Sequence, residues 1–334
     1  TGGTGGMAAS DAGAPSDLVD CVTTYDTTLA MDSSKKCKSY TTLPPQSTKI
    51  DLGPYGATSQ YNVGKDFAIT PSSSDTDNGA TCSVVGGTFM EDPMQTAKLL
   101  KTDDLDFGLY SIFYPADWPA GQKLPIIVWG NGTCAAPEGY GALLRYVASY
   151  GYFIVAPNSR WVGQSDPKSG KTPMFRALDY AFAETANTAS EFYQKLDTTK
   201  VGAMGHSQGG SATVTEATDS RVQSVIIWNA ANGATKPWFS VSGDMDVFST
   251  TPAAMQTASK ASMPSAWMYF HNPVGQGPIR GHLVLMITPQ RVVQQTVAWW
   301  DMMLKGSADA KATFTGSTCK WCGHDSDYEF GANL

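Results

Sequence analysis

The feature that most constrains the fold is a series of short apolar runs that alternate with helical stretches from about residue 124 onward. The runs 124–129, 153–156 and 201–204 are apolar at almost every position. Strands of a parallel sheet have this composition because helices cover both of their faces. Helical stretches such as 139–150 and 173–188 lie between the runs. The pattern predicts an α/β fold with a mostly parallel sheet.

The segments before residue 124 follow a different pattern. Residues 108–113 alternate in character like a sheet strand, and 66–69 and 82–89 are also expected to form strands. The first strands of the sheet are therefore expected to be antiparallel. No repeat of 20–50 residues and no second alternating series is visible, so one catalytic domain is expected over residues 61–310.

The two ends of the chain differ in composition from this domain. Residues 1–17, rich in Gly, Ser, Ala and Asp, are expected to form a flexible tether. Residues 18–60, rich in Thr, Ser and Pro, are expected to form an extended N-terminal segment that wraps the domain, and residues 311–334 a C-terminal tail with two cysteines. The chain opens without an initiator Met or an apolar leader, which indicates a chain whose targeting segment has been removed.

Composition excludes several classes of protein. Apolar residues make up 42% of the chain and charged residues only 16%, which excludes a disordered or coiled-coil protein. No apolar run approaches the roughly 18 residues of a membrane span, so none is expected. The net charge of −7 argues against a nucleic acid partner, which requires a basic surface. A substrate with little charge of its own fits this balance better.

The six cysteines indicate an oxidising compartment, because an even number allows complete pairing. Spacing alone does not decide the pairs, although local pairing is preferred. A zinc knuckle or a redox site near the C-terminus is less favoured, since zinc needs four ligands and a redox Cys-x-x-Cys opens a helix. We therefore expect no metal site. We expect the protein to be exported to the medium or to the cell surface. The preferred pairs are Cys21–Cys37, Cys82–Cys134 and Cys319–Cys322.

The most informative short motif is G-H-S-Q-G over residues 205–209, a G-x-S-x-G pattern. An apolar strand ends at Met204 and a helix of small residues begins after Gly210, so the motif lies at a strand–turn–helix junction. Such a turn strains the backbone of its central residue and exposes the hydroxyl, while the flanking glycines leave space for neighbouring backbone. Ser207 is the predicted nucleophile.

Residues 195–210 read K-L-D-T-T-K-V-G-A-M-G-H-S-Q-G-G. This segment resembles the cutinase-like polyester (PET) hydrolases of the α/β-hydrolase superfamily, whose elbow reads G-H-S-M-G-G or G-W-S-M-G-G after a similar V-D-T segment. Similar pieces at 110–115, 150–159 and 297–305 extend the resemblance over about residues 60–305. It implies a three-layer αβα sandwich and a serine esterase that needs no cofactor.

A serine hydroxyl needs a general base, and the chain has four histidines. The resemblance favours His282, because its spacing to Trp299 of the final helix is closest to that in the family. His271, which follows a predicted strand, is the alternative. His206 lies inside the elbow and cannot easily turn onto the Ser207 hydroxyl, and the fourth histidine lies in the C-terminal tail.

The acid is expected between the nucleophile and the base, after a strand. Residues 243–246 read G-D-M-D and resemble the family's G-x-D-x-D turn, in which the second carboxylate belongs to the triad. Asp246 is therefore the predicted acid, which would orient His282 and stabilise its imidazolium form. Asp244 is the alternative.

Two backbone N–H groups must stabilise the oxyanion of the tetrahedral intermediate. Gln208, directly after the nucleophile, is expected to supply one, and the resemblance places the other at Gly132, with Thr133 as the alternative. The family's Pro-Gly-Phe/Tyr-Thr reads Gly-Asn-Gly-Thr here, so the aromatic residue that clamps substrate is missing. Trp161, just beyond a strand end, and Thr133 are the predicted substrate-binding residues.

The predicted function is a secreted serine carboxylic-ester hydrolase that acts on neutral esters or polyesters, as a monomer and through an acyl-enzyme. The alternatives are a serine peptidase or amidase on the same fold, or a small-molecule carboxylesterase without polymer activity. A binding or adhesion module that lost activity is less favoured, because a full set of candidate catalytic residues is present.

Overall fold

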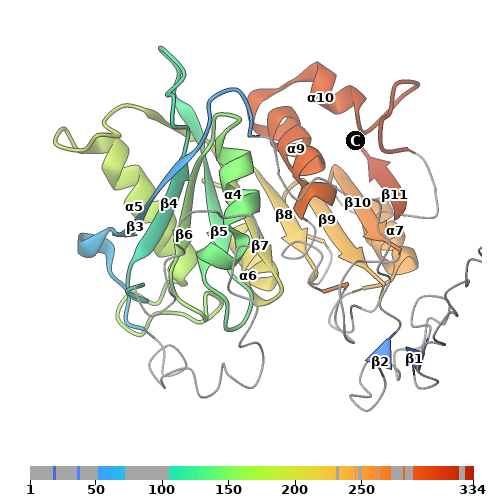
Figure 1. The fold of residues 1–334 in the computed structure, drawn as a ribbon, viewed down its shortest axis with the longest axis horizontal. Helices are drawn as coiled ribbons and strands as arrows, with labels where there is room; N and C mark the ends of the chain where they lie inside the picture. Colours follow the sequence, from blue (N-terminus) through green and yellow to red (C-terminus); the bar gives the residue numbers. More distant parts are fainter. Residues whose placement is uncertain are drawn as a thin grey trace, which may run out of the picture.

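The computed structural model describes residues 18–19, 36–37, 52–71, 105–230, 233–244, 246, 250–261, 263–271, 281–282, 289–322 and 328–334. Nine of the described strands form one sheet in the order β11-β10-β9-β8-β7-β5-β6-β4-β3 (Figure 1). Two short strands, β1 (Leu18–Val19) and β2 (Lys36–Cys37), form a separate parallel pair.

The large sheet is parallel in its centre and antiparallel at both edges. Strands β5 to β10 pair in parallel, while β3 and β4 at one edge and β11 at the other run antiparallel to their neighbours. The predicted α/β class and the antiparallel start are confirmed. The strands are β3 (Thr58–Val63), β4 (Tyr110–Tyr114), β5 (Leu124–Gly130), β6 (Phe153–Pro157), β7 (Leu196–His206), β8 (Ser224–Trp228), β9 (Trp238–Gly243), β10 (Ser265–Phe270) and β11 (Tyr328–Asn333).

Helices cover both faces of the sheet, so the molecule has three layers (Figure 1). Neighbouring residues of β5 face opposite sides: Ile127 belongs to the core under α4 and α9, and Ile126 to the core under α5, α6 and α7. Burial on both faces explains the continuous apolar runs of the sequence. The helices are α4 (Gly141–Ala148), α5 (Pro173–Ala186), α6 (Gln208–Glu216), α7 (Pro252–Ala261), α9 (Val293–Lys305) and α10 (Ala308–Ala312), with short 3₁₀ turns η1 (Lys65–Phe67), η3 (Pro137–Tyr140) and η4 (Pro289–Arg291).

The strand predicted at 66–69 is wrong. The chain forms β3 one segment earlier, then turns at Gly64 with φ of 83° and enters η1. Glycine adopts a positive φ at little energetic cost, so the strand can end at Gly64. The alternation of polar and apolar residues does not by itself predict where this strand ends. The strand predicted at 82–89 lies outside the described residues.

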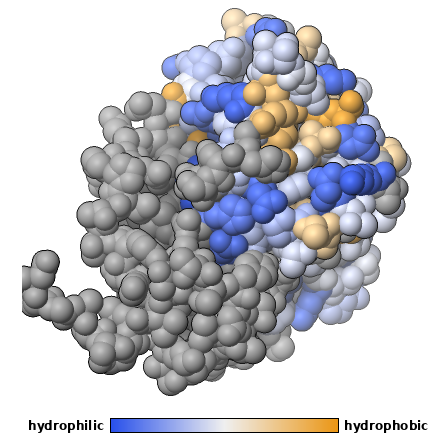
Figure 2. All heavy atoms as spheres, turned by 90° about the vertical axis from the view of Figure 1, so that its right-hand side faces the viewer, coloured by the Kyte–Doolittle hydropathy of each residue, from blue (hydrophilic) through white to orange (hydrophobic). Residues whose placement is uncertain are grey.

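The C-terminal residues, expected as a tail beyond residue 310, contribute a strand to the main sheet. Strand β11 pairs with β10 along its whole length, from Ser265 opposite Asn333 to Phe270 opposite Tyr328. Phe314 before it is fully buried. Burial of such aromatic surface stabilises the segment, so it folds as part of the domain. On the side of the molecule near β11, hydrophilic and hydrophobic residues are interspersed among the described atoms (Figure 2).

One of the three predicted disulfides, Cys319–Cys322, is present. Cys134 is also disulfide-bonded, and no cysteine in the described part of the chain is free. The predicted partner of Cys134 and the predicted pair Cys21–Cys37 involve residues outside the described ranges, as do the tether and most of the N-terminal segment. None of the described helices is long and apolar enough to cross a membrane.

A buried carboxyl group makes the stability of this fold pH-dependent. Glu216, at the end of α6, is fully buried and accepts a 2.7 Å hydrogen bond from the Thr172 hydroxyl, which caps α5. Burial raises the pKa of Glu216 to about 8. The folded protein therefore keeps a proton that the unfolded chain releases above its ordinary pKa of about 4.3. Stability from this group is full below that value and falls as pH rises to about 8.

We expect Glu216→Gln to remove this dependence, because the amide is neutral at every pH and similar in size. Relative to wild type, the free energy of unfolding of the variant should rise by at least about 2 kcal/mol between about pH 5 and pH 9. Urea unfolding at both pH values measures the difference. A constant difference between variant and wild type would show that the Glu216 carboxyl does not titrate in this range.

Candidate active site

The site is centred on the turn between β7 and α6. Ser207 alone separates the two elements and has φ of 55° and ψ of −117°, a strained conformation for a residue with a side chain. Its backbone N–H donates to the carbonyl of Trp228 on β8 at 2.9 Å, which holds the strained turn against the sheet. The strand–turn–helix junction expected from the sequence is therefore present.

The flanking glycines are required by backbone contacts. A Cβ on Gly205 would lie 2.3 Å from the carbonyl oxygen of Gly209, and one on Gly209 would lie 2.1 Å from that of Gly130. Both distances are far inside van der Waals contact. The helix thus packs directly against the ends of β5 and β7, which is how the turn can be this tight.

The structure brings His282 and Asp246 together. The two are 36 residues apart, and Nδ1 of His282 donates to Oδ1 of Asp246 at 2.9 Å. The Asp246 side chain is completely buried and that of His282 is 8% exposed. The ring of His282 lies 4.8 Å, centroid to centroid, from that of His206, which directly precedes Ser207. The pair therefore stands beside the elbow.

The two alternative residues pair with each other. Nδ1 of His271 lies 3.2 Å from Oδ2 of Asp244, and its Nε2 lies 3.1 Å from Oε1 of Glu329 on β11. Both ring nitrogens of His271 thus face carboxylates and leave no nitrogen for a serine hydroxyl. This arrangement favours His282 over His271 as a base.

Asn229, which the sequence analysis missed, supports the His–Asp pair. Its side-chain Nδ2 donates to Oδ2 of Asp246 at 2.7 Å and to the carbonyl of Gly281, next to His282, at 2.9 Å. The residue directly follows β8 and has φ of 51°. A polar residue at the carboxyl end of a parallel strand is the signal that could have indicated it, since functional side chains gather at that edge.

The two predicted oxyanion donors, Gln208 and Gly132, differ in the surroundings of their backbone N–H groups. Gln208 is the first residue of α6, where backbone N–H groups have no partner within the helix. The N–H of Gly132 instead donates to the buried hydroxyl of Tyr140 at 3.0 Å. The role of Gly132 as an oxyanion donor therefore stays a prediction, with its N–H engaged by Tyr140 of η3 in this structure. Thr133, the alternative, follows it and is partly exposed.

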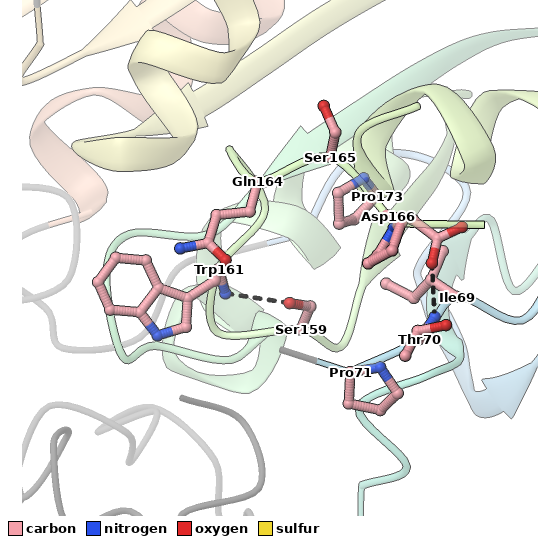
Figure 3. Close-up of a pocket in the computed structure, with 10 residues that line it drawn as sticks. Ile69, Thr70, Pro71, Ser159, Trp161, Gln164, Ser165, Asp166 and Pro173 are labelled. Carbon is pink, nitrogen blue, oxygen red and sulfur yellow. Dashed lines mark hydrogen bonds between the residues drawn. The ribbon is translucent and has the colours of Figure 1, made fainter. Parts of the chain in front are cut away.

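Trp161 lines a cavity of about 230 Å³ beside the loop that follows β6 (Figure 3). Gly163 in this loop donates its N–H to Oε1 of Gln208 at 3.1 Å, which ties the loop to the elbow. Thr133 is not among the described residues that line the cavity. The lining residues are Ile69, Thr70, Pro71, Ser159, Trp161, Gln164, Ser165, Asp166, Pro167 and Pro173.

Asp166 fastens one wall of this cavity to another. Its Oδ1 accepts from the N–H of Thr70 at 3.0 Å (Figure 3). Its Oδ2 accepts from the N–H of Ser169 at 2.9 Å. Burial opposes the charge of this carboxylate, but these hydrogen bonds outweigh it and lower the pKa of Asp166 to about 2. Asp166 is therefore ionised at neutral pH and holds residue 70 against the loop.

The mostly parallel sheet, the strained serine after its central strand and the nearby His–Asp pair define the class of the protein as an α/β-hydrolase. The comparison of its sequence with known families is more specific. The chain belongs to the PET hydrolase-like family, whose sequence profile matches residues 81–277, more than half of the 334 residues. The match includes Ser207 and Asp246 and ends before His282.

A curated relative supports the same class. S-formylglutathione hydrolase from Arabidopsis thaliana is 26% identical over 127 residues, which cover 32% of this chain and 45% of the relative. The chain thus spans less than half the length of the relative that it matches. The family and the relative are both described as hydrolases.

Proposed function

We propose that the protein is a secreted serine carboxylic-ester hydrolase that uses Ser207, His282 and Asp246 as its triad. The observation that carries this proposal is the buried hydrogen bond between His282 and Asp246 next to the strained Ser207. With Nδ1–H directed at the carboxylate, Nε2 of the neutral imidazole is the nitrogen that can accept a proton. This is the arrangement that a serine nucleophile requires.

In the proposed reaction, the Ser207 hydroxyl attacks the ester carbonyl while Nε2 of His282 removes its proton. Asp246 stabilises the imidazolium ion, and the N–H groups of Gln208 and Thr133 stabilise the oxyanion. The alcohol leaves with the proton from His282. Water then attacks the acyl-enzyme while His282 removes its proton, and the carboxylic acid is released as the Ser207 oxygen takes that proton back. The N-terminus of α6 adds a favourable dipole at the oxyanion.

We further propose that the substrates are neutral esters, including polyesters. Membership of a PET hydrolase-like family and the low fraction of charged residues support this substrate class. The three disulfide-bonded cysteines of the described residues, Cys134, Cys319 and Cys322, support an exported protein, since such bonds persist in oxidising compartments. We also propose that the protein is a monomer and that its catalytic domain begins near residue 61. The domain extends past residue 310 to include β11, which pairs with β10.

A small-molecule carboxylesterase is the second candidate, favoured by the size of the cavity at Trp161. About 230 Å³ lies below the roughly 300 Å³ at which ligand pockets usually begin, so it suits one small acyl or alcohol group. The test compares soluble products released from polycaprolactone film with hydrolysis of short p-nitrophenyl esters. The Ser207→Ala variant serves as the blank. Ester hydrolysis without release from film would restrict the function to small molecules.

We expect Trp161→Ala to weaken binding of bulky esters, because the indole forms a wall of the cavity. KM for a p-nitrophenyl ester of an aromatic or long-chain acid should rise about 5- to 20-fold with little change in kcat. KM for p-nitrophenyl acetate, whose acyl group is too small to need the wall, should change less than about twofold. Equal losses on both substrates would mean that Trp161 does not bind the variable group.

A further inference from the structure

A buried chain of hydrogen bonds connects three parts of the site. The N–H of Gly132 donates to the Tyr140 hydroxyl at 3.0 Å, and this hydroxyl lies 2.8 Å from Nδ1 of His206. Nε2 of His206 lies 2.6 Å from the carbonyl oxygen of His282. Tyr140 and His206 are each only 2% exposed, so water does not compete for these bonds.

The direction of each bond follows from its partners. A carbonyl oxygen can only accept, so Nε2 of His206 carries the proton and donates to His282. Nδ1 of the neutral ring is then an acceptor, and the Tyr140 hydroxyl donates to it. The same hydroxyl oxygen accepts from Gly132. Every donor and acceptor in the chain is therefore satisfied in one arrangement only.

Neither His206 nor Tyr140, the two titratable side chains of these hydrogen bonds, changes its protonation state in the pH range where esterases are assayed. Burial lowers the pKa of His206 to about 3 and raises the pKa of the Tyr140 hydroxyl well above its usual range. His206 is thus neutral and Tyr140 protonated from weakly acidic to weakly alkaline pH. The hydrogen bonds keep one polarity under these conditions, which suits a rigid connection and not a proton relay.

The packing around Gly132 shows how closely the connection is built. A Cβ on Gly132 would lie 2.8 Å from both Nδ1 of His206 and the hydroxyl of Tyr140. The Tyr140 and His206 rings are 5.6 Å apart, centroid to centroid. The loop after β5, the elbow and the segment that carries His282 therefore meet at this point.

We propose that Tyr140 and His206 are positioning residues, which hold the oxyanion loop and the base at a fixed separation on either side of Ser207. This inference rests on the proposed ester hydrolysis. Its basis is that each end of the hydrogen-bonded chain adjoins a different part of the proposed machinery. Gly132 precedes the proposed donor Thr133, His206 precedes Ser207, and the last acceptor belongs to His282 itself. Neither Tyr140 nor His206 needs to touch the substrate.

The first test is Tyr140→Phe, which removes only the hydroxyl and leaves two buried partners unsatisfied. We expect kcat for p-nitrophenyl butyrate to fall about 10- to 100-fold with KM within about threefold of wild type, because a displaced base and oxyanion donor raise the barrier without removing binding contacts. The matched control is Tyr152→Phe. Tyr152 is equally buried and donates to Asp301 at 2.7 Å, and it directly precedes the amino end of β6, away from the elbow.

The second test uses three variants of His206. Asn places its amide where Nδ1 was and can keep the bond to Tyr140, whereas Gln reaches as far as Nε2 and can keep the bond to His282. Ala keeps neither. For a positioning role, kcat should follow the order wild type, then Gln and Asn, then Ala, with rescue of at least about fivefold over Ala by one of the amides.

The results separate positioning from mere stability. Equal thermal destabilisation of Tyr140→Phe and Tyr152→Phe, with loss of kcat only in the first, supports the proposal. A kcat of Tyr140→Phe equal to that of wild type would overturn the proposal. If Tyr140→Phe does not fold, equal kcat values in the three folded His206 variants would overturn it. If the wild-type protein does not react with a fluorophosphonate at Ser207, the proposed function itself is refuted. This result is distinct from the outcomes that overturn only the positioning role.

Discussion

Replacement of Ser207 by Ala is expected to leave a folded protein whose kcat/KM for p-nitrophenyl esters is lower by at least about 10³-fold. The reason is that the acyl-enzyme cannot form without the hydroxyl, while the N–H groups and binding contacts that remain stabilise the transition state only partly. The strained φ of 55° is tolerated by Ala about as well as by Ser, so the fold should persist. Steady-state kinetics together with circular dichroism measure both properties.

Ser211→Ala is the matched control for this variant. Ser211 lies on the same helix, one turn beyond the elbow, and its side chain is exposed. It should keep the activity of wild type and react fully with a fluorophosphonate, whereas Ser207→Ala should not react. Labelling of Ser207→Ala at a different serine, with activity retained, would disprove the assignment of the nucleophile.

The second large effect concerns His282, the predicted base, and His271, its alternative. We expect His282→Ala to lower kcat/KM by about 10³-fold or more, because no other base replaces its imidazole. His271→Ala should stay within about fivefold of wild type, since both of its ring nitrogens face carboxylates at the β11 edge of the sheet. Kinetics on the same soluble ester compare the two variants directly.

His271→Ala has its own expected signature. It leaves the carboxylates of Asp244 and Glu329 without their shared partner, so its thermal stability should fall modestly while its activity persists. The reverse result, with an inactive His271→Ala and an active His282→Ala, would transfer the role of base to His271. It would also transfer the role of acid to Asp244, because the two residues are paired.

The two edges of the sheet show where prediction from the sequence stops. The central strands and the elbow follow from local pattern, because burial on both faces requires continuous apolar runs and the turn requires glycines. Strand β11 reads Y-E-F-G-A-N, which is partly polar and contains a glycine, and only its pairing with β10 makes it a strand. Likewise, the segment 66–69 has the composition of a strand, but the left-handed turn at Gly64 directs it into η1 instead.

The candidate site divides in the same way. The position of Ser207 and Gln208 at the strand–turn–helix junction could be predicted because it depends on one contiguous motif. The resemblance of the sequence to a family suggested Gly132 as an oxyanion donor, but Tyr140 engages its N–H in this chain. Asn229 carries no motif, and its importance is visible only where its amide meets Asp246 and the carbonyl of Gly281.

The sequence by itself determined the α/β class, the position of the strained serine and the short set of residues from which a base and an acid could come. Those properties depend on local periodicity, on glycine and on residue order, all of which can be read along the chain. Only the tertiary structure decided that His282 pairs with Asp246 and that His271 pairs with Asp244 and Glu329. The physical reason is that these side chains come from separate loops and strands, whose distances are set by how the sheet brings their ends together.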